Sequence, residues 1–384
     1  MTSSQVNMVP SVDTPDNPDL LTLVITTSPT PSAPATELLS SIFNSFQRHC
    51  PGLLKCRVIL VIDTYDRVAD LNRLKKGTVT AEGARTFAQY KENAKKLVLQ
   101  KYSRPGAHYD YEELILGRDE AEFGSVAYAQ QTNSVPLDIS STDDGRVIFV
   151  EPLQRLGFGL GVRSALRLTK TPYVWIQQHD WSLVADIPLA PLLTIMQRSE
   201  RSSSSNSASD GPDPVPSETP KQKTEKDLRD NTVSVPVKYV CFPSIRMVSY
   251  ATSDHVMQFP ALRALTNLYK QNFTVSPGSP KIPLTPLFFW HDKPHLASTE
   301  HYLENVFPDR ASMARGAFIE DTAGHRARTE MKDGQWKKWA CWLYYPDDGK
   351  KLCVRHLKGR TWRGTDGELE QKMAWMRLGG ALAT

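Results

Sequence analysis

The sequence predicts an α/β protein with a Rossmann-like, mixed but mostly parallel sheet that is flanked by helices. Residues 20–26 form an uninterrupted apolar run, which is typical of a buried parallel strand. Apolar residues then recur at helical spacing over 35–48, and a second apolar run at 55–63 ends in Asp63. A strand, a helix and a strand within so short a stretch predict a βαβ unit with a right-handed crossover.

The middle of the chain continues this alternation. Strands are expected at 146–150 and 173–178, with a helix over 162–169 between them. Residues 66–132 are predicted to be a mainly helical insertion, whose longest helix covers 80–101. The Gly-rich run 157–161 matches neither the dinucleotide fingerprint nor the phosphate-binding loop of nucleotide hydrolases, so we interpret it as a tight turn that enters a helix.

The second half of the chain opens with a Ser-rich tract that has almost no apolar residues. Residues 198–232 are therefore predicted to be a disordered loop, inserted into one domain or linking two. Ordered elements are expected to resume afterwards: a strand at 235–242, a strand-like aromatic run within 284–295, a helix over 298–306, and a hairpin made of 341–345 and 352–357.

Length and composition suit a globular protein. The chain has 384 residues, 40% hydrophobic and 23% charged, and its net charge of +4 is not gathered into long basic blocks, so no nucleic-acid partner is expected. We expect a disordered N-terminus at 1–19, a single domain at 20–365 and a C-terminal tail at 366–384. The five scattered cysteines suggest neither zinc nor disulfides. Without a signal peptide or a membrane segment in the sequence, a cytoplasmic location is expected.

Acidic residues at strand ends are the first candidates for a functional site. Asp63 and Asp180 follow predicted parallel strands, so both should lie at the sheet edge where α/β proteins bind ligands. Magnesium or manganese needs only one or two protein carboxylates besides substrate phosphates. His179 or His356 offers a nitrogen ligand for manganese, and the Glu320-Asp321 pair offers a general base. Taken alone, each of these residues is equally compatible with a turn, a partly buried ring or an ordinary surface acid.

Two other groups of residues have open interpretations. His291, Asp292 and His295 are interpreted as the wall of a polar and aromatic pocket, because Pro294 prevents the helix that a zinc-binding pair of histidines would need. Four tryptophans are candidates for stacking against sugar rings, although simple packing is the commoner role: Trp181, Trp290, Trp336 and Trp339.

In this order, the segments resemble the GT-A glycosyltransferases, particularly the inverting enzymes similar to family 2. The resemblance covers roughly residues 20–360. A buried strand leads into the polar turn 26–29, and a second strand ends in Asp63. A helix and a strand then precede Gln178-His179-Asp180 at the position of the family's DxD motif, and Glu320-Asp321 follows later. Gln178 stands where the family's first acid would be.

The resemblance implies a GT-A-like fold and a sugar transfer from a nucleotide-diphosphate donor to a hydroxyl acceptor, with inversion. By this resemblance Asp321 is the base and Glu320 its neighbour, while Asp180 and His356 hold Mn²⁺ or Mg²⁺. The implied donor site comprises Thr27, Ser28, Asp63, Arg163, His179 and Asp180. With only one acid in the motif, a metal-independent enzyme or a catalytically inactive binding or scaffold protein with the same fold is the alternative.

Overall fold

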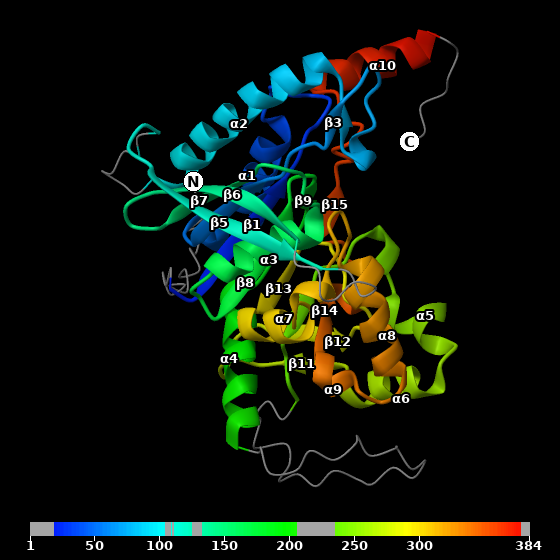
Figure 1. Ribbon diagram of the computed structural model, residues 1–384. Coiled ribbons are helices and arrows are strands. Elements are labelled where there is room, and N and C mark those ends of the chain that lie inside the picture. Colours follow the sequence, from blue (N-terminus) through cyan, green and yellow to red (C-terminus); the bar gives the residue numbers. More distant parts are fainter. Residues whose placement is uncertain (1–18, 104–108, 110, 125–132, 206–234, 378–384) are drawn as a thin grey trace, which may run out of the picture.

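The computed structural model describes residues 19–103, 109, 111–124, 133–205 and 235–377 (Figure 1). Its main feature is an 11-stranded mixed sheet with the strand order β11-β12-β14-β10-β13-β8-β1-β2-β7-β6-β5. These strands are β1 (Leu21–Thr27), β2 (Arg57–Ile62), β5 (Ile115–Phe123), β6 (Asn133–Ser141), β7 (Val147–Pro152), β8 (Tyr173–Gln178), β10 (Tyr239–Cys241), β11 (Gln271–Phe273), β12 (Ile282–Pro286), β13 (His295–Ser298) and β14 (Cys341–Tyr344).

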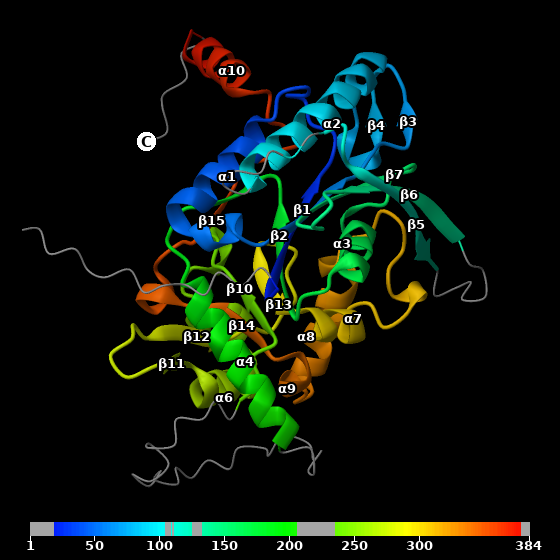
Figure 2. The ribbon, with the colours of Figure 1, turned by 90° about the vertical axis from the view of Figure 1, so that its left-hand side faces the viewer.

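Four strands at the centre, β7, β2, β1 and β8, run parallel. Their side chains are almost wholly buried on both faces, as expected for parallel strands covered by helices. In Figure 2, α1 (Glu37–His49) and α2 (Ala81–Tyr102) lie on one side of β1 and β2, and α3 (Phe158–Leu168) lies on the other. The parallel centre therefore sets one edge at which β1, β2 and β8 all end.

Beyond β8 the sheet changes direction. β13 pairs antiparallel with β8, and β10 then pairs antiparallel with β13. The chain that leaves β10 and the chain that enters β13 therefore meet at the same edge as the carboxyl ends of β1 and β8. Two small sheets complete the strands, one formed by β3 (Arg67–Val68) and β4 (Thr78–Val79), the other by β9 (Trp181–Leu183) and β15 (Val354–His356).

The remaining α-helices are α4 (Leu189–Ser205), α5 (Asp254–Met257), α6 (Pro260–Tyr269), α7 (Thr299–Asn305), α8 (His325–Lys332), α9 (Trp336–Trp339) and α10 (Thr365–Arg377). In the part of the chain that the structure describes, every helix is too short or too polar to cross a bilayer. All five cysteines are buried and free.

Sequence reasoning predicted the central elements well. The expected strands at 20–26, 55–63, 146–150 and 173–178 correspond to β1, β2, β7 and β8, and the expected helices at 35–48 and 80–101 to α1 and α2. Of the Gly-rich run, only Gly157 precedes the helix as its N-cap, because α3 begins at Phe158, four residues before the expected start at 162. The mixed α/β class is confirmed.

Two predictions were wrong. The region 66–132 is not mainly helical, because after α2 the strand β5 forms an antiparallel hairpin with β6. Only its last residues, 120–123, alternate acidic and apolar side chains, and most of β5 is exposed, so the local sequence gives little sign of a strand. The expected hairpin of 341–345 and 352–357 does not form either. β14 enters the main sheet beside β10, whereas β15 pairs with β9.

The Ser-rich tract begins later than predicted, because α4 continues through Ser205. The rest of the predicted disordered loop, 206–232, lies outside the described residues, as does almost all of the predicted disordered N-terminus, 1–19. The predicted tail at 366–384 begins as helix α10, and its last residues are likewise outside the description.

Candidate functional site

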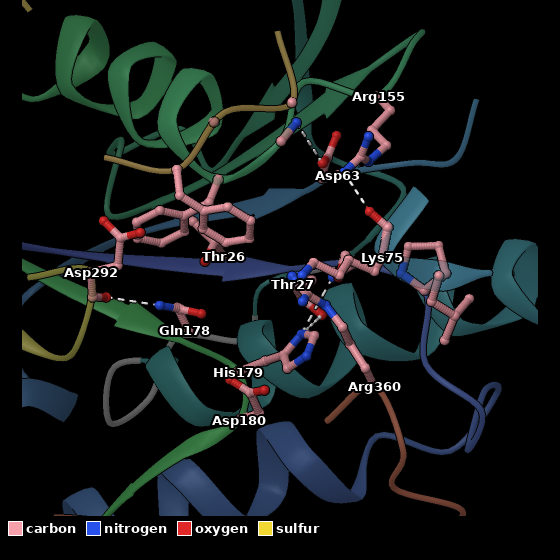
Figure 3. A pocket seen from close by; sticks show the side chains of 18 of the residues that line it. Thr26, Thr27, Asp63, Lys75, Arg155, Gln178, His179, Asp180, Asp292 and Arg360 are labelled. Atoms are coloured by element: carbon pink, nitrogen blue, oxygen red, sulfur yellow. Dashed lines mark hydrogen bonds between the residues drawn. The ribbon is translucent and has the colours of Figure 1, made fainter. Parts of the chain in front are cut away.

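A cleft of about 790 Å³ opens at the edge where β1, β2 and β8 end. Residues from many parts of the sequence meet in it, and Figure 3 shows Asp63 with Arg155 on one side and Gln178 with Asp292 on the other. The sequence-predicted site residues that line the cleft are Thr27, Ser28, Asp63, His179, Asp180, Glu320, Asp321 and His356. Trp181 also lines it, whereas Trp290, Trp336 and Trp339 are fully buried in the core.

Arg163 is the predicted donor-binding residue that the structure does not bring into the cleft. It lies on α3, and its guanidinium donates a hydrogen bond to the carbonyl oxygen of Glu122 in β5, at 2.9 Å. The helix was placed correctly, but this side chain leaves it toward the β5–β6 hairpin, an element that the sequence did not predict.

Asp180 and His356 meet because β9 and β15 pair, which sets Trp181 opposite His356. His356 Nε2 lies 3.0 Å from Asp180 Oδ2, and the same oxygen accepts a 3.1 Å hydrogen bond from the Gly359 amide. Burial would raise the pKa of Asp180, but the hydrogen bond from His356, the nearby imidazoles and the Gly359 amide outweigh it and lower this pKa to about 2. Asp180 is therefore an anion over the whole physiological range.

The depressed pKa of Asp180 predicts a loss of stability in acid. Unfolded Asp180 takes up a proton near pH 4, and the folded residue does so only near pH 2. The carboxylate therefore contributes roughly 2 kcal/mol above pH 4, and this contribution is lost as the pH falls toward 2. Denaturant titrations of the wild type and Asp180→Asn at pH 5, 3 and 2 should give a difference that shrinks with acid. A constant difference would contradict the assignment.

The 3.0 Å separation of Asp180 Oδ2 and His356 Nε2 is that of a hydrogen bond, in which Nε2 donates its proton to the carboxylate. The same two atoms could hold a divalent cation only if the cation replaced that proton and both groups turned toward it. Within the described residues, no group of three or more His, Cys, Asp and Glu side chains is arranged to hold a metal. A cation bound here would therefore need its other ligands from substrate phosphates and water.

Asp63 serves first as a link between β2 and the turn before α3. Its carboxylate accepts hydrogen bonds from the amides of Leu156 at 2.7 Å, Gly157 at 2.9 Å and Thr64 at 3.0 Å. Burial raises the pKa of Asp63 to about 6, although these amides and the nearby Arg155 oppose the rise. Asp63 thus fixes the turn at this side of the cleft, and both of its carboxylate oxygens already accept hydrogen bonds from the backbone.

Gly157 is required by that turn. It has φ +81° and ψ 170°, a conformation that is essentially restricted to glycine. A Cβ there would lie 2.5 Å from Cα of Gly316. Gly157→Ala should therefore lower the free energy of unfolding by about 3 kcal/mol or more. Gly278→Ala is the matched control, because Gly278 has the same φ but open space around it. Equal losses in urea titrations of the two variants would contradict the close approach.

His179 organises the turn after β1. Its Nδ1 accepts a hydrogen bond from the Ser28 amide at 3.3 Å, so the neutral ring carries its proton on Nε2. Nδ1 also lies 2.7 Å from the Thr27 hydroxyl, which in turn contacts the Tyr90 hydroxyl at 2.6 Å. Burial lowers the pKa of His179 despite the neighbouring Asp180. His179 is therefore a neutral scaffold for residues 27 and 28, with Nδ1 committed.

Glu320 and Asp292 hold two loops together across the cleft wall. Glu320 Oε1 accepts hydrogen bonds from His291 Nδ1 and the Asp292 amide, both at 3.0 Å, and Asp292 Oδ1 accepts one from the Glu320 amide at 3.1 Å. Burial and the charge of Glu320 raise the pKa of Asp292 well above its usual range. Of the three residues interpreted as a pocket wall, Asp292 lines the cleft, whereas His291 and His295 do not, and His295 is fully buried.

Asp321 differs from its neighbour. It is exposed, it lines the cleft, and within the described residues it has no hydrogen bond or ion pair. Glu320 and Asp321 begin a π-helical turn, Glu320–Gly324, which leads into α8, and such turns occur frequently at functional sites. Of the two acids, Asp321 has the carboxylate that is free to meet a ligand.

Sequence reasoning missed the cations of the cleft. Lys358 and Arg360 follow β15, and Figure 3 shows Arg360 reaching toward Thr27 and His179. Four other cationic side chains that had no predicted role also line the cleft: Lys75, Arg155, Arg246 and Lys293. The alternation of basic residues around Gly359 is the only sequence signal for any of them. Gly359 itself lies against Asp180, since a Cβ there would be 2.8 Å from the Asp180 Cβ.

Gln178 has a structural role at the end of β8. Its side-chain amide donates a 2.8 Å hydrogen bond to the carbonyl oxygen of Asp292, and thereby ties the end of β8 to the loop before β13. A carboxylate at this position has no proton to donate to that carbonyl.

No protein-family model matches the chain, and no curated protein matches it significantly. The functional assignment therefore depends on the geometry of the cleft.

Proposed function

We propose that this protein is a glycosyltransferase with a GT-A-like fold, which moves a sugar from a nucleotide-diphosphate donor to a hydroxyl acceptor with inversion. The observation that supports the proposal is that four candidate site residues meet in one cleft. Asp63, Asp180, Asp321 and His356 are far apart in sequence, yet they line one cleft at the carboxyl edge of a parallel sheet centre. Ligands of open α/β sheets bind at this edge.

In this proposal the diphosphate of the donor lies near Asp180. Lys358 and Arg360 come from the loop that Gly359 pins to Asp180, and they bring two positive charges to the same part of the cleft. A magnesium or manganese ion held by Asp180 and His356 would neutralise further charge on the leaving group. Donors that are already oriented toward the developing charge are usually the largest contribution to catalysis.

The acceptor reacts on the side of Asp321. The acceptor oxygen attacks the anomeric carbon and forms the new glycosidic bond, while the bond from that carbon to the diphosphate oxygen breaks. The nucleoside diphosphate leaves with the electron pair of that bond, and the Asp321 carboxylate takes the proton from the acceptor hydroxyl. Glu320 positions this region through His291 and the Asp292 loop rather than by proton transfer.

One observation favours the alternative of a binding protein without turnover. Gln178 replaces the first acid of the expected motif and is used for a structural hydrogen bond. A protein of this kind would still bind a nucleotide sugar. Only turnover separates the two functions.

The test is a panel of nucleoside diphosphates and nucleotide sugars, with and without Mn²⁺, in calorimetry and in an assay for released nucleoside diphosphate. We expect one donor to bind and to release its diphosphate. Arg360→Ala should weaken donor binding about tenfold or more, whereas Arg355→Ala, on the same segment but outside the cleft lining, should not. Binding without release would favour the alternative, and no binding to any donor would overturn both.

The cytoplasmic location stays a prediction.

A further inference from the structure

Arg246 and Lys293 form a second cationic part of the cleft, on the side opposite Asp63. Arg246 lies on the turn Ile245–Met247 after β10, and Lys293 lies just before β13. Because β10 and β13 are antiparallel with Cys241 opposite His295, both side chains enter from the same sheet edge. Both line the cleft together with Glu320 and Asp321.

In the described part of the chain, these two cations are not held in direct ion pairs, although the charge of Glu320 acts on Lys293. Within the described residues, neither Arg246 nor Lys293 forms an ion pair or a side-chain hydrogen bond. Glu320 accepts hydrogen bonds from His291 and the Asp292 amide, so its carboxylate is already engaged. Lys293 is half-buried, and burial lowers its pKa although Cys241 and Glu320 oppose this, while the charge of Arg246 adds a smaller lowering effect. Two like charges that repel each other at a ligand-accessible surface are stabilised when an anion binds between them.

The order of the strands places this pair away from the diphosphate. Along the edge, Asp63 follows β2, Thr27 ends β1, Gln178 ends β8, Lys293 precedes β13 and Arg246 follows β10. Neighbouring strands are about 4.8 Å apart, so the start of β13, which Lys293 precedes, is about 5 Å beyond the end of β8, and the end of β10, which Arg246 follows, is roughly 10 Å beyond it. The cations that accompany Asp180 are Lys358 and Arg360. Arg246 and Lys293 are therefore grouped with Asp321, in the acceptor half.

We propose that the acceptor of this enzyme is an anionic saccharide, whose carboxylate, phosphate or sulfate group is bound by Arg246 and Lys293. The proposal rests on the proposed function, because it takes the Asp321 side of the cleft as the acceptor half. The guanidinium of Arg246 can bind such a group through two parallel hydrogen bonds, while Lys293 adds a point charge from the opposite loop. A neutral acceptor would leave both charges unpaired.

The test measures saccharide and nucleotide binding separately, by calorimetry on the full chain. The saccharide probes are matched neutral, uronate-containing, phosphorylated and sulfated oligosaccharides, and the nucleotide probes are nucleoside diphosphates. We expect the wild type to prefer an anionic oligosaccharide over its neutral counterpart at least about tenfold. Arg246→Gln and Lys293→Met should each remove about 10- to 100-fold of this affinity and reduce its salt dependence. Nucleoside-diphosphate affinity should change less than about threefold.

The controls remove a cation elsewhere. Arg263→Gln and Lys281→Met make the same charge changes at exposed residues outside the cleft lining, so they should not alter saccharide preference. Arg246→Lys should restore part of the preference, and circular dichroism checks that each variant is folded. Equal binding of neutral and anionic saccharides, or no saccharide binding at all, would overturn the proposal. So would an equal loss of nucleoside-diphosphate affinity. If nucleoside diphosphates do not bind the wild type, the glycosyltransferase assignment is wrong. The saccharide measurements would still test whether Arg246 and Lys293 bind an anionic group.

Discussion

Asp321→Asn is expected to lower the rate of glycosyl transfer by about 10² to 10⁴, with little change in the affinity for the donor. The asparagine side chain keeps the size and polarity of the aspartate, but it cannot take the proton from the acceptor hydroxyl. Because the Asp321 side chain has no hydrogen bond or ion pair within the described residues, the variant should also retain the wild-type stability. Single-turnover rates and calorimetric donor affinities together measure the effect.

Glu320→Gln distinguishes the two neighbouring acids. Glu320 is bound to His291 and to the Asp292 loop, so its replacement should reduce the free energy of unfolding as well as activity. Asp333→Asn, at an exposed position beyond α8 and outside the cleft lining, is the control for loss of an acid nearby. Full activity in Asp321→Asn, or a rate loss in Glu320→Gln larger than in Asp321→Asn at unchanged stability, would move the base assignment to Glu320.

The central strands were predictable because their signal is local. Arg57–Ile62 and Tyr173–Gln178 are buried on both faces, and their mainly apolar runs are typical of parallel strands that are covered by helices. The outer strands lack this signal. β15 covers only Val354–His356, and its partner β9 is distant in sequence, so the pairing depends on tertiary contacts. For such short strands the sequence pattern does not show which strand is the partner, and the predicted hairpin of 341–345 and 352–357 was therefore wrong.

The candidate site was predictable to the extent that it is built from strand ends. Asp63 and Asp180 could be placed at one edge because parallel strands end there together. The same reasoning cannot show that His356 reaches Asp180, or that Gln178 binds the Asp292 carbonyl, since both contacts join segments that only the folded sheet brings together. The cations Arg246 and Lys293 belong to irregular loops, whose course no periodicity predicts.

The Asp180–His356 pair carries the second large prediction. Asp180→Asn should reduce Mn²⁺-supported affinity for a nucleoside diphosphate at least about 10- to 100-fold, because even groups that only support a metal ligand have effects of this size. His356→Gln should have a similar effect. If both residues bind the same cation, the double variant should lose little more than either single variant, as expected for residues that act as one unit. Calorimetry with Mn²⁺, Mg²⁺ and no divalent ion measures these affinities without any need for turnover.

The chain supplies a matched control in a second Asp–His pair. His49 Nδ1 and Asp186 Oδ1 are 2.8 Å apart, but both residues lie outside the cleft lining and Asp186 is exposed. Asp186→Asn therefore breaks the same kind of contact without touching the cleft, and it should leave the Mn²⁺ dependence unchanged. If nucleoside diphosphate binds the wild type equally well with and without divalent ions, Asp180 and His356 do not hold a cation. Lys358 and Arg360 would then neutralise the diphosphate alone, and Lys358→Met with Arg360→Ala should abolish binding instead.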